Sequence, residues 1–476
     1  MVAVALALAA RWSWGARGEG PAFRPQPDAL EYAASAQALV QTGRFFLQVG
    51  PLEEPPHYSP GWPAVLAVAL ECGTPPQRLW LLPGLCGGLL CLVLGCGTAL
   101  LVIQAAPPPR TTARWWAGLV AGWAAACAWA VAPPAVEAGS ALLNDEPTAL
   151  LATAALCLVF LGLERDKPVP WLAAAGLAGG LTAAMRPVEG ALLAVPALVL
   201  VVGAARRLGS GRRRRAYGAL ALGALVPCML VGLLLVHSGR PAWQWTDYGF
   251  WNPAGRLTLE PRLAGLLSQA RPLLGLPWSG WSLGGWWPLL GWLAGGWILV
   301  RRRRGTAGAP AGCTAQARFL PYPVRVLTAA LLLWVLARLA VFGSYYYSAS
   351  RFYLAAAAAL LFLAAGGCGL YAVAVPRRAW IAGVALVGVL ASLGTAFVRF
   401  RATLVPGAPP ERIFRRFSGW MELTDEERAR QPVPFDPLLA QAVGLLDPET
   451  LQDIHGWGPL PPTLHVLRLR RKGLLP

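Results

Sequence analysis

Residues 176–202, GLAGGLTAAMRPVEGALLAVPALVLVV, contain two apolar runs that meet with almost no loop between them. Arg186 and Glu189 stand at the junction. An arginine at membrane depth costs about 2.5–3.5 kcal/mol on insertion scales, so it normally has an acidic partner or an anionic ligand. Two interpretations of Arg186 therefore stay open: an ion pair with Glu189, or the binding of an anion. In either case the stretch predicts two membrane spans joined by a very short turn.

Apolar runs of this kind recur along the chain, which has 476 residues, 56% of them hydrophobic and 13% charged. A helix needs about 20 apolar residues to cross a bilayer, so the runs predict an all-α polytopic membrane protein. We expect about eleven transmembrane helices. They fall at 1–16, 79–105, 115–135, 147–163, 170–185, 190–205, 217–237, 283–300, 326–343, 353–375 and 380–398.

The formal net charge of +18 would suggest a nucleic-acid partner in a soluble protein. Here the basic residues form short clusters between apolar runs, as in cytoplasmic loops that face anionic lipid, so we expect no nucleic-acid partner. The alternation of these clusters leaves five segments on the opposite, outer face: 17–78, 136–146, 186–189, 238–282 and 344–352. Arginines after the last predicted span, beginning with Arg399 and Arg401, do not fit the alternation.

The sequence predicts two parts of unequal size. A transmembrane domain covers 1–400, and its first outer loop, 17–78, contains interfacial helices. A small polar tail covers 401–476 and is expected on the outer side. The nine cysteines lie almost all inside apolar runs and form no Cys-x-x-Cys pair, so neither a disulfide framework nor a zinc site is predicted.

The first outer loop contains an acidic segment. Asp28, Glu31, Tyr32 and Ser35 have the spacing i, i+3, i+4, i+7, which places them on one face of a helix that starts after Pro27. One interpretation is local: Asp28 caps the helix and Glu31 completes a capping box. The other is catalytic, because the positive end of a helix keeps a carboxylate ionised and able to act as a base. The two interpretations are compatible.

Two more polar segments fall on the predicted outer face. In EEPPHYSPGW, His57 is either a ligand or base, or a structural residue among prolines, and an apolar helix of about 12 residues follows, too short to span. In SALLNDEPTALL, Asn144, Asp145 and Glu146 precede a helix, where acids suit the positive end of the dipole. Capping alone does not explain a second acidic cluster on the same face as the first.

Arg351 lies among several tyrosines at the outer edge of a predicted span, where snorkelling and an aromatic belt are the simplest explanation. Nevertheless, two acidic clusters and two arginines reach one membrane face, and we find no cytoplasmic nucleotide motif. This combination favours a lipid-bound phosphate donor.

Five motifs, in this order, carry a family likeness. They are DALEYAASAQALVQTGR (28–44), PPHYSPGWPAVLAVALECG (55–73), NDEPTALLATAALCL (144–158), GLAGGLTAAMRPVEGALLAVPAL (176–198) and SRFYLAAAAALLFLAAGG (350–367). With them the chain resembles the GT-C glycosyltransferases, in particular the bacterial members related to protein O-mannosyltransferases and lipid A aminoarabinose transferases. Many relatives have adjacent Asp and Glu in the first motif, whereas here Ala29 follows Asp28. Asp28 is therefore the best candidate for the base.

The resemblance implies a GT-C fold and an inverting glycosyltransferase. A polyprenyl-phosphate-linked sugar would be the donor, and a lipid, glycan or protein of the cell envelope the acceptor. The enzyme would lie in the bacterial cytoplasmic membrane, with its active site facing the periplasm or exterior. Asp28 would take the proton of the acceptor hydroxyl, with Glu31 or Glu146 orienting that group, and Arg186 and Arg351 would neutralise the departing phosphate.

No cofactor is expected except a divalent metal, which Asp28 and Glu146, or Glu31, would hold if one is used. The residues expected to bind the substrate or its phosphate are Tyr32, His57, Tyr58, Asp145, Glu146, Arg186 and Arg351. Tyrosines 345–347 are candidates to flank the sugar or the prenyl chain.

Two other functions stay open. Intramembrane arginines and acids also mark transporters and flippases for lipid-linked or small anionic substrates, although here the acids lie near one face and not at the midplane. A noncatalytic assembly subunit that keeps the fold is the third hypothesis.

Overall fold

The computed structural model describes sixteen stretches of the chain. They are residues 2–15, 27–49, 52–54, 56, 58–75, 78–79, 81–105, 112–139, 142–164, 167–205, 210–239, 266–267, 270–276, 285–300, 322–343 and 350–402. The predicted tail, 401–476, lies outside them except for residues 401 and 402, which end the last helix.

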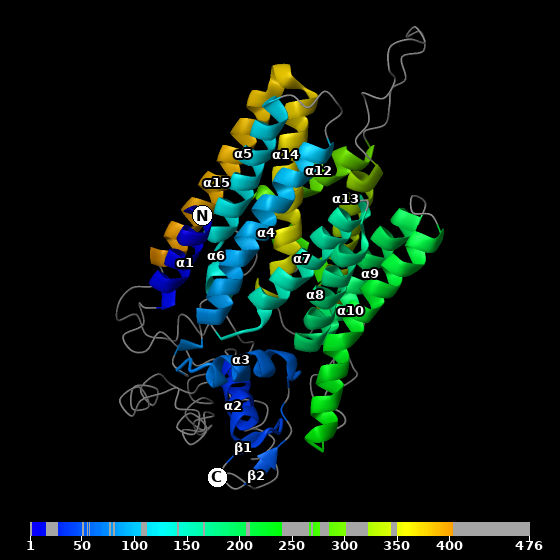
Figure 1. Cartoon of the computed structure of the whole chain (residues 1–476). Coiled ribbons are helices and arrows are strands. Elements are labelled where there is room, and N and C mark those ends of the chain that lie inside the picture. Colours follow the sequence, from blue (N-terminus) through cyan, green and yellow to red (C-terminus); the bar gives the residue numbers. More distant parts are fainter. Residues whose placement is uncertain are drawn as a thin grey trace.

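Every predicted apolar run contains a helix, and the helices form one elongated bundle (Figure 1). They are α1 (Val2–Gly15), α4 (Leu81–Ala105), α5 (Thr112–Ala130), α7 (Asp145–Glu164), α8 (Val169–Met185), α9 (Pro187–Ala205), α10 (Ser210–His237), α12 (Trp287–Val300), α13 (Tyr322–Gly343), α14 (Leu354–Ala374) and α15 (Ala379–Ala402). The prediction of a helical, multi-pass membrane protein is confirmed, with one small β-hairpin in addition to the helices.

Length and hydrophobicity identify fewer membrane-crossing helices than the sequence predicted. Among the described residues, six helices are long and apolar enough to span, and the bent pair of α5 and α6 (Pro133–Gly139) makes a seventh. The helices α8, α9 and α12 are apolar but shorter. Eleven crossings therefore stay a prediction.

Burial distinguishes central from peripheral helices. Alanine and glycine residues fill α14, which is buried along nearly its whole length and packs against α4, α5, α7, α12 and α15. By contrast, α10 exposes a row of large apolar side chains that includes Leu222, Leu230 and Leu233. Exposed apolar side chains along a helix of this length fit contact with lipid acyl chains. On its other face, α10 packs closely along α8, where Gly176 leaves room only for the α10 backbone.

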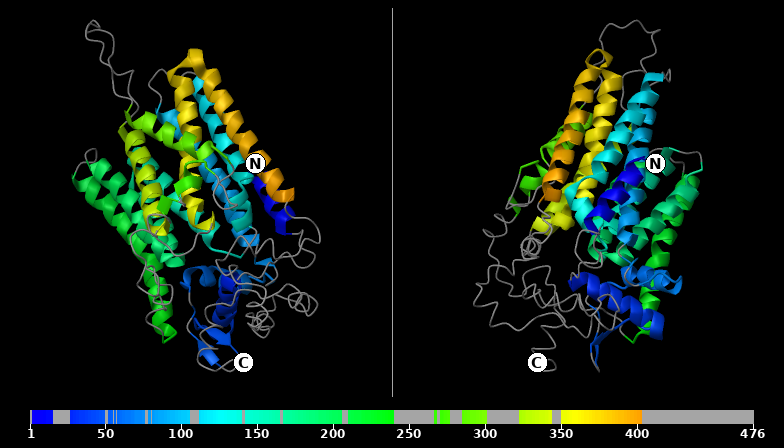
Figure 2. Two further views of the ribbon diagram at one scale, coloured as in Figure 1. Left: turned by 180° about the vertical axis from the view of Figure 1, so that it is seen from behind. Right: turned by 90° about the vertical axis from the view of Figure 1, so that its left-hand side faces the viewer.

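The segment predicted to be the first outer loop forms a small layer at one end of the bundle, the lower end in Figure 1, and this layer is called the outer layer after that prediction. It consists of α2 (Pro27–Thr42), a hairpin of β1 (Leu47–Val49) and β2 (Leu52–Glu54), and α3 (Gly61–Glu71). The helix predicted to start after Pro27 and the short apolar helix predicted after the prolines are both present. The hairpin was not predicted. Figure 2 shows the same layer at the same end of the bundle from two other sides.

Contacts join this layer to several helix ends that the charge pattern assigns to the outer face. The amide of Phe45 donates to the hydroxyl of Ser238, just after α10, over 2.8 Å. The hydroxyl of Ser59 donates to the carbonyl of Ala184, near the end of α8. Segments predicted to share one face of the membrane therefore meet at one end of the molecule.

Candidate functional site

The acidic face of α2 turns inward, toward the segment that precedes α3. Glu31, Tyr32 and Ser35 are all buried. The Glu31 carboxylate accepts a hydrogen bond from the amide of Tyr58 over 3.0 Å, and the rings of Tyr32 and Tyr58 lie 4.9 Å apart. Two of the motifs identified in the sequence thus contact each other, with a backbone-to-carboxylate bond that fixes the start of the second motif.

The start of α3 lies against the end of α8 without room for a side chain between them. The hydroxyl of Ser59 donates to the carbonyl of Ala184. A Cβ atom added to Gly61 would lie 2.4 Å from the carbonyl carbon of Ala184 and 2.7 Å from the amide nitrogen of Met185. Real Cβ contacts are not that short, so glycine is required here for the outer layer to reach the helix end.

The bundle has a break between α8 and α9. Arg186 has extended backbone angles, φ −151° and ψ 90°, and Pro187 begins the next helix. Because proline has no amide hydrogen, and a helix end leaves carbonyls unpaired, α8 needs partners from elsewhere. Ser59 donates to Ala184, and the side-chain amide of Asn144 donates to the carbonyl of Met185 over 3.1 Å. The outer layer and the start of α7 together complete the end of α8.

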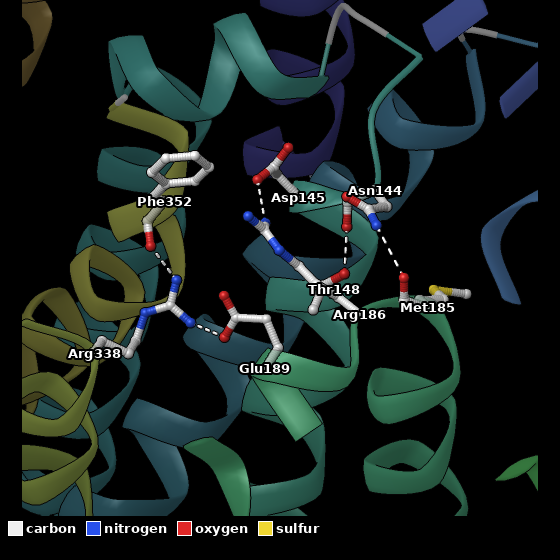
Figure 3. Close-up of polar contacts among 8 residues, drawn as sticks. All are labelled: Asn144, Asp145, Thr148, Met185, Arg186, Glu189, Arg338 and Phe352. Atoms are coloured by element: carbon white, nitrogen blue, oxygen red, sulfur yellow. Dashed lines mark hydrogen bonds and ion pairs between the residues drawn. The ribbon is translucent and has the colours of Figure 1, made fainter. Parts of the chain in front are cut away.

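The guanidinium of Arg186 lies at this junction (Figure 3). Its Nη1 donates to the Asp145 carboxylate over 2.5 Å, and its Cζ lies 5.7 Å from the ring centre of Phe342 and 5.4 Å from that of Phe352. The Asp145 side chain is 3% exposed, whereas the Arg186 side chain is 19% exposed. Of the two interpretations of Arg186, the ion pair with Glu189 is wrong: Arg186 pairs with Asp145, and its extended backbone interrupts the helical spacing that would favour Glu189.

Glu189 instead pairs with an arginine that the sequence analysis did not single out. The Nη1 of Arg338 donates to the Glu189 carboxylate, and the Nη2 of the same guanidinium donates to the carbonyl of Phe352, as the dashed lines in Figure 3 mark. The side chains of Arg338 and Glu189 are 1% and 2% exposed. An arginine inside an apolar run was the available signal.

Phe352 belongs to a short 3-10 turn, η4 (Ser350–Tyr353), that leads into α14. Its ring stacks on that of Phe342, with 5.2 Å between centres. Tyr353 is fully buried and directly precedes α14, and its ring lies 6.4 Å from that of Phe342. The turn η4 and α13 thus supply the two aromatic rings, Phe352 and Phe342, that the Arg186 guanidinium contacts.

Comparisons with known proteins show a similarity in fold, found by structure and not by sequence. No protein-family model and no curated protein matches the sequence. The structure does match that of ArnT from Cupriavidus metallidurans bound to undecaprenyl phosphate, with a TM-score of 0.55 and 17% identity over 93% of this chain and 84% of that one. The chain has a GT-C fold. The resemblance predicted from the motifs is confirmed to that extent.

Two further matches have the same GT-C fold. Apo ArnT from the same organism matches with a TM-score of 0.53 and 16% identity, over 98% of this chain and 90% of that one. An oligosaccharyltransferase from Archaeoglobus fulgidus, in complex with Zn and sulfate, matches with a TM-score of 0.53 and 15% identity. That match covers 97% of this chain but 57% of the other, so this chain corresponds to little more than half of it.

The predicted divalent metal would need several acidic, histidine or cysteine side chains close together. Within the stretches that the structure describes, no group of three His, Cys, Asp or Glu side chains could hold an ion. Asp145 is paired with Arg186, and Glu31 accepts the Tyr58 amide. The described side chains therefore do not form a metal site, and we assign no step to a metal.

The side chains of several predicted site residues lie outside what the structure describes. Asp28 falls within the first turn of α2 and Arg351 within η4, but their side chains are not described; His57 and tyrosines 345–347 are not described at all. Of the other candidates, Glu146 is fully buried at the start of α7, next to Asp145. In the GT-C fold of this chain, Glu31, Tyr32 and Tyr58 thus form one cluster and Asp145 and Arg186 a second, joined through Ser59 and the end of α8.

Proposed function

We propose that the protein is a membrane glycosyltransferase that moves a monosaccharide from a polyprenyl-phosphate donor to an acceptor on the outer face of the cytoplasmic membrane. The acceptor would be a lipid, glycan or protein of the cell envelope. The GT-C fold over nearly the whole chain supports a lipid-phosphate donor, since ArnT has been solved with undecaprenyl phosphate and the Archaeoglobus enzyme with a dolichol-phosphate.

The observation that carries the proposal is the placement of Arg186. A planar guanidinium that keeps part of its surface exposed, while a buried carboxylate and two aromatic rings hold it, is suited to a phosphate oxyanion. Charge grows on the donor phosphate as its bond to the sugar breaks, so a fixed cation there lowers the barrier. Asp145 orients the arginine without covering all of it.

In this mechanism the acceptor hydroxyl attacks the anomeric carbon from the face opposite the phosphate. The hydroxyl proton passes to Asp28, the new glycosidic bond forms, and the bond between the sugar and the phosphate oxygen breaks. The sugar is transferred with inversion, and polyprenyl phosphate leaves with the bonding electrons. Asp28 falls in the first turn of α2, where the helix dipole favours the ionised carboxylate that a base requires.

A transfer assay tests this proposal. Membranes containing the protein are incubated with radiolabelled polyprenyl-phosphate sugars, and label in the acceptor fraction is counted for the wild type, Asp28→Asn and Glu71→Gln. Glu71 is an exposed carboxylate in the same outer layer and serves as the matched control. We expect Asp28→Asn to lose about 100-fold or more of the transfer rate, as for loss of a general base, and Glu71→Gln to keep it.

Unchanged transfer by Asp28→Asn would remove the proposed base. Movement of labelled donor across the membrane by the wild type, with no transfer of sugar, would instead favour a transporter or flippase.

A further inference from the structure

Arg338 is a buried cation that the proposed mechanism does not use. It lies in α13, its side chain is 1% exposed, and both of its terminal nitrogens are bonded, one to Glu189 and one to the carbonyl of Phe352. It also faces the rings of Trp334 and Phe342, at 5.8 and 5.2 Å. The guanidinium therefore connects three separate elements: α13, α9 and η4.

Stability alone is a weak reason for such a pair. Burying two charges costs several kcal/mol per ion, and well-packed apolar residues often stabilise a protein as much as a buried ion pair does. What the pair supplies, and apolar packing does not, is a fixed direction between its partners.

The two hydrogen bonds of Arg338 reach two elements that adjoin Arg186, namely α9 through Glu189 and η4 through Phe352. Glu189 lies in the first turn of α9, three residues after Arg186. Phe352 places its ring 5.4 Å from the Arg186 guanidinium and adjoins Arg351 in η4. Loss of either hydrogen bond of Arg338 would let the break that contains Arg186 shift relative to the turn that contains Arg351.

We propose that Arg338 is a positioning residue: by bonding Glu189 and the Phe352 carbonyl at once, it sets the spacing between the α8–α9 break and η4, and so the place where a lipid phosphate binds. This inference rests on the proposed function, because it assumes that Arg186 binds that phosphate. A lysine at the same position would keep the charge beside Glu189, but its single ammonium on a flexible stem does not reproduce the planar fork.

The test measures binding of radiolabelled undecaprenyl phosphate to the purified full chain in lipid nanodiscs. Two variants are compared with the wild type: Arg338→Lys, and the double variant Glu189→Gln with Arg338→Gln, which removes both charges together and leaves no unpaired buried ion. Thr328→Val is the control, because Thr328 is a buried polar residue of α13 whose hydroxyl bonds only within the helix, to the Val324 carbonyl, among the described residues. The thermal midpoint of each variant reports whether it is folded.

We expect Arg338→Lys and the double variant to bind about 10-fold more weakly or worse, since small displacements of a binding group have effects of this size or larger. Their thermal midpoints should stay near that of the wild type, and Thr328→Val should bind normally. Wild-type binding by either folded variant would overturn the inference and leave the proposed function standing. No binding by the wild type, together with no sugar transfer, would overturn the proposed function itself.

Discussion

At the scale of single residues, the chemistry depends on which carboxylate each arginine meets. Arg186 and Glu189 are neighbours in sequence, and a helical spacing of three residues favours a pair between them. The extended backbone of Arg186 breaks that helix, so Arg186 meets Asp145 from α7 and Glu189 meets Arg338 from α13. Sequence spacing predicts contacts within one helix, and both pairs here join different helices.

Arg186→Lys is a sharp test at this scale, because lysine keeps the charge beside Asp145 and loses the plane that rests on two aromatic rings. We expect the donor KM to rise about 10-fold, because an ammonium lacks both the planar fork suited to a phosphate and the flat face that stacks on the rings. The thermal midpoint should change little. The measurement is donor KM in the transfer assay, with Thr328→Val as the variant that should match the wild type. An unchanged KM would show that the arginine does not contact the phosphate.

At the scale of elements, the outer layer reaches the bundle through the close approach of α3 to α8. Gly61 makes this approach possible, since its missing side chain leaves room for the Ala184 carbonyl. The sequence predicted the two helices of the layer and their order. It did not predict their docking, because the contact depends on Gly61 and on Ser59, whose bonding partner Ala184 is 125 residues away in sequence.

Gly61→Ala should therefore push α3 away from the end of α8. Overpacking of this kind lowers the free energy of unfolding by about 1–3 kcal/mol. We also expect a lower rate of sugar transfer, because Glu31 and Tyr58 would move relative to Arg186. Gly218→Ala is the matched control, because a Cβ at Gly218 in α10 meets no atom within 4 Å. The measurements are the thermal midpoint and the rate of sugar transfer of both variants. Wild-type behaviour of Gly61→Ala would contradict the docking described above.

At the scale of the whole molecule, the alternation of basic loops along the sequence agrees with the way the helix ends meet. Hydrogen bonds at one end of the bundle join the segment after α2 to the end of α10, and the starts of α3 and α7 to the end of α8. Arg338 of α13 joins η4 to the start of α9. Hydrophobicity sufficed to predict the helices, and the membrane side of each loop stays a prediction from the charge pattern. The arginine at 338 is visible inside its apolar run, but its bonding partners were not predictable, because that run contains no acid.

Sidedness makes a prediction for cysteine labelling. Cys72, exposed at the end of α3, should react with a membrane-impermeant maleimide added to intact cells, when the other cysteines are replaced by alanine. A cysteine introduced by Lys167→Cys, at an exposed position two residues before α8, should react only after the membrane is permeabilised. Labelling of both sites in intact cells, or of Lys167→Cys alone, would contradict the assigned topology.

The most direct measurement is an experimental structure of the protein in a lipid nanodisc with undecaprenyl phosphate bound. We predict that the phosphate contacts the Arg186 guanidinium, between Asp145 and the rings of Phe342 and Phe352. The Asp28 carboxylate should open onto the same site. A phosphate bound away from Arg186 would contradict the account, and so would an Asp28 side chain that α3 separates from the bound phosphate.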